Sequence, residues 1–356
     1  MPIQFSNLHD ILNHGFAQVI DVRSPAEFAD DHVPGAINLP ALSNEERAEV
    51  GTLYKQVSPF LARKKGAALV LRNIATHLNG PLASQSGDWR PLVYCWRGGQ
   101  RSGVFSTLLR EIGWRAETIK GGYQSYRRIV QHGLYEGTLP HHIVLLDGNT
   151  GTAKTALLPL VAARGVQVLD LEGLANHRGS LIGAMQGAQP SQRQFESALA
   201  AALLGLDPAK PLLVEAESSK IGRINLPPAL WTRMLAAPRI EVTAPVSARA
   251  AYLARAYDGV LRDVDTVRHK LAPLRRLRGH QVVDQWQSLQ DRGDYLALAE
   301  ALVTDHYDPA YAKSRRARDQ GPEAKVAAAS LDAAALEELA DEVARAVTGI
   351  ELPSQT

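Results

Sequence analysis

Short apolar runs that alternate with helical patterns place the strongest limit on how this chain can fold. One series, which includes QVIDV, GAINLP and RPLVYC, fills residues 1–136. A second series, which includes IVLLD, VQVLDLE, PLLVEAE and RIEVTA, follows within residues 137–356. Since strands that alternate with helices pair in parallel, the pattern predicts an α/β fold with two domains at these bounds, each a parallel sheet with helices on its faces. A length of 356 residues also favours two hydrophobic cores over one.

Local signals mark where several helices begin and end. Ser24 and Pro25 are typical of an N-cap and a first helical residue. Ser43 with Glu46 fits a capping box at the head of a second helix. Gly113 stands where a helix-terminating glycine belongs.

Two further stretches bear on the organisation of the chain. The segment HGLYEGTLPHH at residues 132–142 contains glycine and has no periodicity, so we predict a linker there. Everything after about residue 246 is predicted to be helical. Its last helix lies within residues 330–347, where four apolar side chains recur at helical spacing. They are Leu336, Leu339, Val343 and Val347.

Composition limits the class of protein. The 39 Lys and Arg residues nearly balance the 37 Asp and Glu residues, and this small excess is too weak to indicate nucleic-acid binding by itself. A single cysteine excludes an intramolecular disulfide, and no cysteine spacing resembles a zinc site. The stretch MPIQFSNLHDILNHG lacks the pattern of a secretory signal, and no apolar run is long enough to span a bilayer. We therefore expect a cytoplasmic protein with no membrane partner.

The lone cysteine, Cys95, lies in the segment PLVYCWRGGQRSG. In a parallel sheet, ligands bind beyond the carboxyl ends of the strands, which is where PLVY places this thiol. Gly98 and Gly99 are predicted to adopt left-handed turns, so that backbone N–H groups curl around the sulfur at a helix N-terminus. Arg97 and Arg101 add positive charge, and each of these effects favours the nucleophilic thiolate. The alternative is a small, buried core residue at the end of a strand.

Three segments of the first domain, VIDVRSPAEFADDHVPGAINLP, VYCWRGGQRS and IKGGY, resemble the rhodanese family. The resemblance implies a sulfurtransferase fold in which the loop cysteine carries a persulfide. Residues 43–90 are longer than the matching part of single-domain rhodaneses and are predicted to be an elaboration. The spacing from Cys95 to Arg101 also matches the Cys-x5-Arg loop of rhodanese-like phosphatases. Spacing alone therefore leaves chalcogen transfer and dephosphorylation open.

A phosphate-binding loop is indicated at the start of the second domain by the segment HIVLLDGNTGTAKTALL. Its frame is nearly G-x-x-x-x-G-K-[ST], in which backbone N–H groups cradle phosphate. Lys154 would meet the phosphate charge, and Thr155 would offer a hydroxyl to a magnesium ion. Ala153 replaces the second glycine, and we predict it as the first helical residue, where its methyl group would crowd a phosphate. The predicted diphosphate-binding residues are Gly148, Asn149, Thr150, Gly151, Thr152, Ala153, Lys154 and Thr155.

Charged residues follow two strands of the second domain. Asp170 and Glu172 end VLDLE, and Glu215 and Glu217 end LLVEAE. Because side chains two residues apart share one face of a strand, each pair could hold a metal ion or its water shell beside the phosphate loop. Solvated loop charges are the alternative, and no metal beyond magnesium at Thr155 is suggested. The candidate anion clamps are Arg178 and Arg223.

Two basic stretches, residues 268–281 and 313–318, contain few acids. Such a run is usually a solvated helix face, but it also suits contacts with RNA phosphates. The sequence leaves both interpretations open.

Taken together, the two domains resemble the bacterial tRNA 2-selenouridine synthase family. The resemblance rests on YCWRGGQRS, GNTGTAKT, LDLEGLANHRGS and VEAESSKIG in that order, and it covers nearly the whole chain. It implies an enzyme that acts on the wobble 2-thiouridine of tRNA. It also implies that geranyl diphosphate first alkylates the sulfur, and that selenium from selenophosphate then replaces the S-geranyl group. Both small molecules are co-substrates, and no covalent cofactor is expected.

The resemblance suggests a role for each site. We hypothesise that the loop Gly148–Thr155 binds the departing diphosphate, and that Cys95 carries selenium as a perselenide. Two other functions stay open: a sulfurtransferase coupled to a nucleotide-binding regulatory domain, and a tRNA-binding protein with an inactive phosphate loop. The predicted anion loop for selenophosphate comprises Trp96, Arg97, Gly98, Gly99, Gln100, Arg101 and Ser102.

Overall fold

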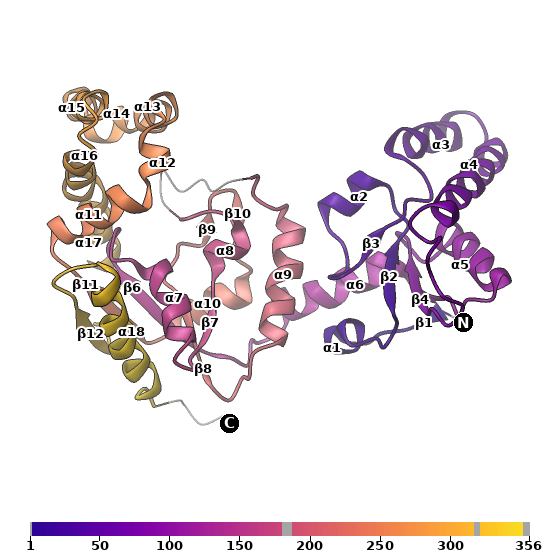
Figure 1. Ribbon diagram of the computed structural model, residues 1–356, viewed down its shortest axis with the longest axis horizontal. Helices are drawn as coiled ribbons and strands as arrows, with labels where there is room; N and C mark the ends of the chain where they lie inside the picture. The colour runs from indigo at the N-terminus through magenta and orange to yellow at the C-terminus, as the bar shows by residue number, and fades with distance from the viewer. Residues whose placement is uncertain (1, 180–186, 317–320, 352–356) are drawn as a thin grey trace. The chain divides into compact units, whose positions relative to one another are not determined.

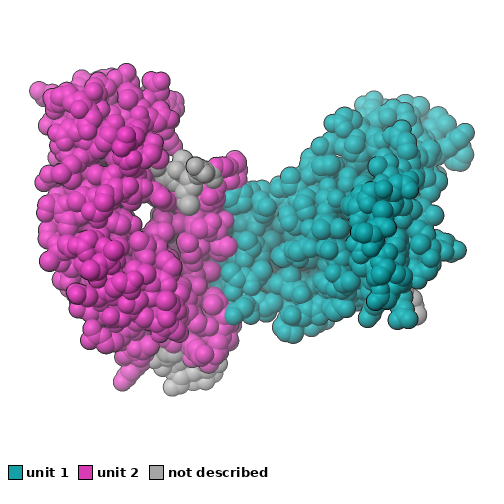
Figure 2. Space-filling model, viewed as in Figure 1, with its two compact units in different colours: residues 1–138, 190–205 teal, residues 139–189, 206–356 magenta. Residues whose placement is uncertain are grey.

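The computed structural model describes residues 2–179, 187–316 and 321–351, without the side chains of residues 313–316. The chain divides into two compact units (Figure 1 and Figure 2). Unit 1 contains residues 1–138 and 190–205, and unit 2 contains residues 139–189 and 206–356. Each unit is built on a parallel sheet with helices around it, which confirms the predicted α/β fold class.

The sheet of unit 1 has five strands in the order β1-β5-β4-β2-β3, and every neighbouring pair is parallel. Ile20, Leu92 and Val93 in its middle strands are fully buried, as expected for strands packed on both faces. In this order β4 is the central strand. Its carboxyl end therefore lies in the middle of the carboxyl-terminal edge of the sheet, where ligands of parallel sheets bind. The strands are β1 (Pro2–Ile3), β2 (Gln18–Asp21), β3 (Ile37–Asn38), β4 (Pro91–Tyr94) and β5 (Glu117–Ile119).

The helices of unit 1 begin and end at the predicted signals. Ser43 and Glu46 form the expected capping box, in which each backbone N–H donates to the other residue's side chain, at 2.9 and 3.2 Å. Pro25 follows the N-cap Ser24, and Gly113 ends its helix with a φ of 113°. The helices are α1 (Leu8–Leu12), α2 (Pro25–Asp30), α3 (Asn44–Gln56), α4 (Pro59–Asn79), α5 (Gln100–Ile112), α6 (Gly122–Gln131) and α9 (Gln192–Leu204).

The predicted linker at residues 132–142 is wrong at its start. Residues His132–Glu136 form a π-helical turn, η1, that continues α6. Leu134 is buried within it, and Tyr135 donates from its hydroxyl to Glu196 at 2.6 Å. Burial of the leucine stabilises a turn that glycine content alone disfavours.

Helix α9 packs in unit 1 although the chain enters unit 2 before it. The hydroxyl groups of Ser197 and Tyr123 both donate to one carboxylate oxygen of the buried Asp31, at 2.9 and 2.7 Å. Arg193 pairs with Asp30 at 2.7 Å. The contacts of Ser197 and Arg193 attach α9 to the end of α2, and Tyr123 connects α6 to the same buried acid.

The sheet of unit 2 also has five parallel strands, in the order β12-β11-β6-β8-β7. The four strands predicted for this domain are confirmed. Strand β12 (Ala324–Ala327) contradicts the prediction that everything after about residue 246 is helical, because its alanine-rich sequence gains hydrogen bonds from β11 that no local propensity indicates. The others are β6 (His142–Gly148), β7 (Gln167–Leu169), β8 (Pro211–Glu215) and β11 (Arg239–Thr243), with β9 (Lys220–Ile221) and β10 (Ile224–Asn225) as a separate antiparallel pair.

The first helices of unit 2 are α7 (Lys154–Ala162), which follows the phosphate loop, and α8 (Leu171–Ala175). Helix α10 (Pro228–Ala236) precedes β11. The segment between β11 and β12 is helical in its described part and has a core of its own around the fully buried Trp286. It comprises α11 (Val246–Ala256), α12 (Asp258–Leu261), α13 (Val264–Leu271), η2 (Ala272–Leu274), α14 (Arg275–Arg278), α15 (His280–Asp291), α16 (Tyr295–Leu302), η3 (Val303–Tyr307) and α17 (Asp308–Arg316).

The last helix, α18 (Ala333–Thr348), confirms the predicted amphipathic pattern. Leu339, Val343 and Val347 are buried in the core of unit 2, and Leu336 is partly buried against it. Within residues 2–179, 187–316 and 321–351, no helix is long and apolar enough to cross a membrane.

The burial of α18 predicts the effect of truncating one of its apolar side chains. Leu339→Ala should lower the free energy of unfolding of unit 2 by about 2–5 kcal/mol, because it leaves a cavity in a packed core. Glu338→Ala, at the exposed neighbouring position, should change it by less than about 0.5 kcal/mol. Denaturant unfolding of the full chain measures both. Equal effects of the two substitutions would contradict the core position of α18.

Candidate functional site

Cys95 follows β4 directly, at the carboxyl end of the sheet, as predicted. Its side chain is buried, with 4% of its surface exposed. The sulfur lies 3.1 Å from the hydroxyl oxygen of Ser102, and that hydroxyl group donates to the Gly99 carbonyl oxygen at 3.3 Å. Ser102 belongs to the first turn of α5. The thiol therefore occupies the strand-to-helix loop where the rhodanese resemblance places a chalcogen-carrying cysteine.

Glycines allow the backbone to close around this loop. Gly98 adopts the predicted left-handed conformation, with a φ of 65°. Gly99 has a φ of −101°, so the prediction of a second left-handed turn is wrong. The second close approach comes from the KGGY segment instead: Gly122 has a φ of 57°, and a Cβ atom there would collide with the Cys95 carbonyl oxygen. That oxygen accepts a hydrogen bond from the Tyr123 N–H at 2.8 Å, so the start of α6 fixes the cysteine loop.

The arginines around the loop differ in their surroundings. Arg101 is partly buried and donates to Glu27 at 2.9 Å. Burial raises the pKa of Glu27, but the hydrogen bond and charge of Arg101 help to outweigh it, so that this pKa lies below its ordinary value. Arg97 is exposed. Sequence reasoning missed Arg23, which is buried against Asp21 and lies 3.9 Å from the centre of the Tyr123 ring.

The aromatic and amide members of the predicted anion loop lie at its surface. Trp96 is half-buried, and its ring centre lies 5.3 Å from that of Tyr123. Gln100 is exposed at the first position of α5. The loop thus presents an aromatic ring and two arginines beside a buried thiol.

In unit 2, the phosphate loop connects β6 to α7. Lys154 is buried, and its ammonium group donates to the Gly148 carbonyl oxygen at 3.0 Å and lies 3.9 Å from Glu215. Burial lowers the pKa of Lys154, but Tyr311 and several carboxylates outweigh it, so the net direction is upward and the ammonium group is charged. A buried positive charge therefore faces the loop, as a phosphate ligand requires.

Ala153 is not the first helical residue, contrary to prediction. It is the N-cap of α7, buried and left-handed with a φ of 60° and a ψ of 24°, and Lys154 begins the helix. Non-glycine residues rarely adopt this conformation, which explains why the related motif prefers glycine here. The alanine therefore carries backbone strain at the point where the loop enters the helix.

Two residues outside the motif position the loop, and sequence reasoning missed both. Arg249 is buried and forms a two-pronged ion pair with Asp308, at 2.8 and 2.7 Å. Arg249 also donates to the Thr150 carbonyl oxygen at 3.2 Å, and Asn149 donates to Asp308 at 2.9 Å. The pair thereby connects α11 and α17 to the first half of the phosphate loop.

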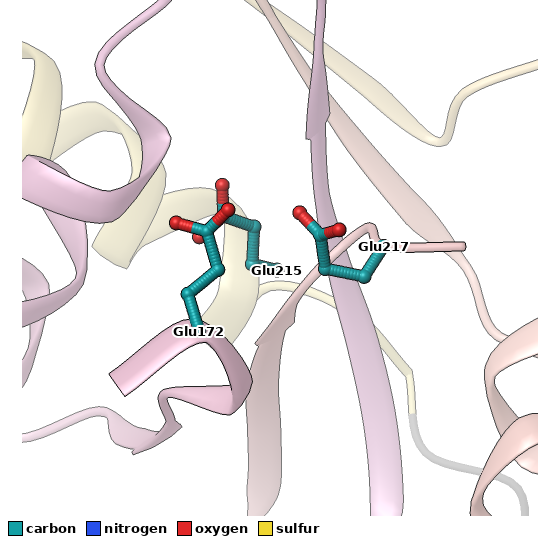
Figure 3. A group of neighbouring side chains, drawn as sticks. All are labelled: Glu172, Glu215 and Glu217. Carbon is teal, nitrogen blue, oxygen red and sulfur yellow. The ribbon is translucent and has the colours of Figure 1, made fainter. Parts of the chain in front are cut away.

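Three of the four predicted acids come together beside this loop (Figure 3). Glu172, Glu215 and Glu217 each offer a carboxylate oxygen within 4.8 Å of the others. Thr155 donates its hydroxyl to Glu172 at 2.8 Å, and Glu215 lies 3.2 Å from the same hydroxyl. Carboxylate and hydroxyl oxygens suit magnesium, so the donor set fits the ion that the motif implies.

The predicted arrangement of the acids on strands is only partly right. Glu215 ends β8, but Asp170 is the N-cap of α8 and accepts from the Gly173 N–H at 2.7 Å. Glu172 lies in the helix itself, so it does not share a strand face with Asp170. Strand β7 ends at Leu169, three residues before Glu172, because the Asx-type cap at Asp170 begins a helix there.

The environment of the acids raises two pKa values. Burial is the main cause for Glu215, whose pKa rises to about 7 although Lys154 opposes the shift. Burial and the neighbouring carboxylates raise the pKa of Glu217 to about 8. Near neutral pH, the cluster therefore holds protons that a divalent cation would displace.

These groups line a cavity of about 580 Å³ in unit 2. The loop from Thr150 to Thr155 and the three glutamates belong to its lining. Arg178 also lines it, donates to the Ala256 carbonyl oxygen at 3.0 Å and stacks on Tyr257 at 4.8 Å. Arg223 does not line the cavity, since it is exposed and donates to Gln189. The remaining lining is largely apolar or aromatic and includes Tyr252, Leu253, Tyr257, Tyr307 and Tyr311.

Comparisons with known proteins account for both units. Residues 5–129 match the rhodanese-like domain, and residues 141–269 match the tRNA 2-selenouridine synthase AAA domain. A tRNA 2-selenouridine synthase from Alcanivorax borkumensis is 32% identical over 348 residues, which cover 87% of this chain and 94% of the relative. One from Hahella chejuensis is 34% identical over 333 residues, which cover 83% of this chain and 85% of the relative. This chain belongs to the tRNA 2-selenouridine synthase family.

As a member of the tRNA 2-selenouridine synthase family, the chain is a tRNA-modifying enzyme, namely a transferase that introduces selenium. The rhodanese match contains Cys95 and its loop, and the AAA-domain match contains the phosphate loop and the three glutamates. Among solved structures, a rhodanese-related protein from Thermoplasma volcanium aligns with 35% of this chain and 92% of its own length, at 19% identity and a TM-score of 0.22. That likeness is too weak to add to the family assignment.

The basic stretches of this family member are only partly free for RNA. Arg268 pairs with Asp291 at 2.8 Å, Arg275 with Asp284 at 2.5 Å, and Arg278 donates to the His306 carbonyl oxygen at 2.8 Å. These contacts favour a structural role for much of residues 268–281. In the second stretch, residues 317 and 318 lie outside the described residues, as do the side chains of residues 313–316.

The raised pKa values predict how stability changes with pH. In the folded state Glu215 and Glu217 keep their protons above the ordinary pKa of 4.5. The folded state thus binds more protons than the unfolded chain, and the free energy of unfolding falls as pH rises from about 5 to about 8, by at most about 1.4 kcal/mol per pH unit for each group. Glu217→Gln should flatten this slope in denaturant unfolding without divalent cations.

The matched control for that measurement is Glu338→Gln, because Glu338 is exposed on α18. It should keep the wild-type slope. A Glu217→Gln slope as steep as the wild-type slope would show that the cluster does not hold its protons in this range.

Proposed function

We propose that this enzyme converts the wobble 2-thiouridine of tRNA to 2-selenouridine through an S-geranyl intermediate, with geranyl diphosphate and selenophosphate as co-substrates. The observation that carries the proposal is the composition of the cavity in unit 2. Its lining combines Lys154 and the phosphate loop with several tyrosines and Leu253. A diphosphate attached to an apolar chain matches both kinds of lining.

The proposed alkylation requires stabilisation of a diphosphate leaving group, which the residues of this cavity can supply. The sulfur of 2-thiouridine attacks the first carbon of geranyl diphosphate, and the bond from that carbon to the diphosphate oxygen breaks. The departing diphosphate gains negative charge, which the buried Lys154 and the backbone N–H groups of the loop stabilise. A magnesium ion held by Thr155 and the three glutamates would neutralise further charge on the diphosphate.

The apolar and aromatic part of the lining supports a prenyl substrate over a free phosphate. Leu253, Tyr257 and Tyr307 line both the cavity and a small hollow that also contains Leu261 and Leu302. Contact with these side chains removes the apolar chain of geranyl diphosphate from water.

We assign Cys95 to the second step. A thiocarbonyl sulfur is a poor leaving group, but once alkylated it departs from C2 of the base as geranyl thiol, selenium from selenophosphate bonds to C2 in its place, and hydrolysis of the phosphorus–selenium bond releases phosphate. The buried sulfur, the Gly98 turn and the adjacent Arg97 and Arg101 form a loop that suits the tetrahedral head of selenophosphate. The two steps thus use different units of the chain.

Replacing the buried lysine tests the first step. Lys154→Ala should reduce transfer of the geranyl group at least about 100-fold, because the departing charge loses its buried cation. Mass spectrometry of tRNA nucleosides after incubation with geranyl diphosphate measures the product. Lys210→Ala, an exposed lysine of the same unit, is the matched control and should leave the rate unchanged. Full transfer by Lys154→Ala would contradict the assignment of the loop.

Replacing the cysteine tests the second step. Cys95→Ala should accumulate S-geranyl tRNA and form no 2-selenouridine when both co-substrates are present, because alkylation does not need the thiol. Cys95→Ser keeps the size of the side chain and should behave in the same way. The same nucleoside analysis reads both products. Normal formation of 2-selenouridine by either variant would remove Cys95 from the selenium step.

A further inference from the structure

A groove on unit 1 has no part in the chemistry described so far. It has a volume of about 590 Å³ and lies between the α3–α4 hairpin and the start of α5. Its apolar floor is formed by Val50, Ala62, Gly66 and Val70. Val104 also lines the groove, and 38% of its surface is exposed. A volume in this range suits a small organic ligand. We call this feature the hairpin groove.

Cations surround the hairpin groove. Arg47, Lys55, Arg63 and Arg101 line it, and within the described residues no aspartate or glutamate does. Tyr54, which is 55% exposed, also lines it. An apolar floor beneath a positively charged rim fits a ligand that joins an apolar chain to an anion.

The hairpin groove continues to the cysteine loop. A second hollow of about 470 Å³ shares Arg47 and Arg101 with it. Trp96, next to Cys95, and Arg193 line this second hollow, together with Glu27 and Asp30. An aromatic ring beside arginines is the usual setting for a stacked base and its phosphates. The hairpin groove and a hollow suited to a nucleotide therefore adjoin each other at the cysteine loop.

We propose that the hairpin groove binds the S-geranyl chain of the alkylated tRNA during the selenium step, with the modified base in the hollow at Trp96. This inference rests on the proposed function, in which the bond between C2 of the base and the alkylated sulfur breaks beside Cys95. The chain is bonded to that sulfur, so it must lie against surfaces next to the loop. The hairpin groove is an apolar surface there, and its arginines match the tRNA backbone.

Such a groove gives the selenium step its substrate preference. Unalkylated 2-thiouridine places nothing on the apolar floor, whereas the S-geranyl form buries its chain there. The enzyme should therefore bind S-geranyl tRNA more tightly than unalkylated tRNA. Residues 43–90, which we predicted as an elaboration of the rhodanese domain, contain α3 and α4 and hence most of the groove.

A pair of neighbouring alanines on α4 allows a direct test. Ala67 lines the groove and is exposed, and Ala68 is exposed but does not line it. Ala67→Trp should fill the groove without disturbing the core, and Ala68→Trp is the matched control. The measured quantity is the ratio of Kd values of the full chain for an anticodon hairpin with 2-thiouridine and for the same hairpin with S-geranyl-2-thiouridine.

We expect the wild type and Ala68→Trp to prefer the alkylated hairpin by at least about tenfold, and Ala67→Trp to lose that preference. A preference that survives in Ala67→Trp, or is absent from the wild type, would overturn the proposal. It would also be overturned if Ala67→Trp abolished alkylation by geranyl diphosphate but kept the preference, since the groove would then hold the free diphosphate. Failure of the proposed function is read separately, as no 2-selenouridine from S-geranyl tRNA and selenophosphate with wild-type enzyme.

Discussion

The charge balance between Lys154 and the neighbouring carboxylates determines which ligands the site in unit 2 can bind. One buried ammonium group faces Glu172, Glu215 and Glu217, so the site carries more negative than positive charge unless protons or a cation make up the difference. Burial and mutual repulsion raise the pKa of Glu215 and Glu217, so bound protons offset part of this negative charge near neutral pH. A divalent cation would displace those protons and offset the same charge.

Backbone conformation organises the two loops in different ways. In unit 1, glycines at residues 98 and 122 let two chain segments approach more closely than a Cβ atom permits. In unit 2, Ala153 adopts a left-handed conformation that glycine would take more easily. The surrounding contacts, including the ion pair of Arg249 and Asp308, hold this loop in place. The first loop thus depends on missing side chains, and the second on side chains that constrain it.

The sequence predicted the fold class, most strands and the residues of both loops, because apolar periodicity and glycine spacing are local signals. It did not predict β12, whose alanine-rich segment becomes a strand only through its partner β11. The N-cap role of Asp170 separated it from Glu172, which strand periodicity had paired with it. Arg23 and Arg249 act through partners distant in sequence or through aromatic faces, so no spacing rule identifies them. Long-range packing is the part that a single sequence conceals.

The position of α9 has a consequence for how the chain can be divided. Because residues 190–205 belong to unit 1, the backbone passes between the two units three times, near residues 138, 189 and 205. A fragment that ends at residue 138 would lack Ser197 and Glu196, so the buried Asp31 would lose one hydrogen-bond donor and the Tyr135 hydroxyl would lose its acceptor. The rhodanese unit is therefore not an independent module joined by one tether. Its complete fold requires α9, which is translated only after the phosphate loop and the rest of residues 139–189, so the second unit must already be partly synthesised before the first can be completed.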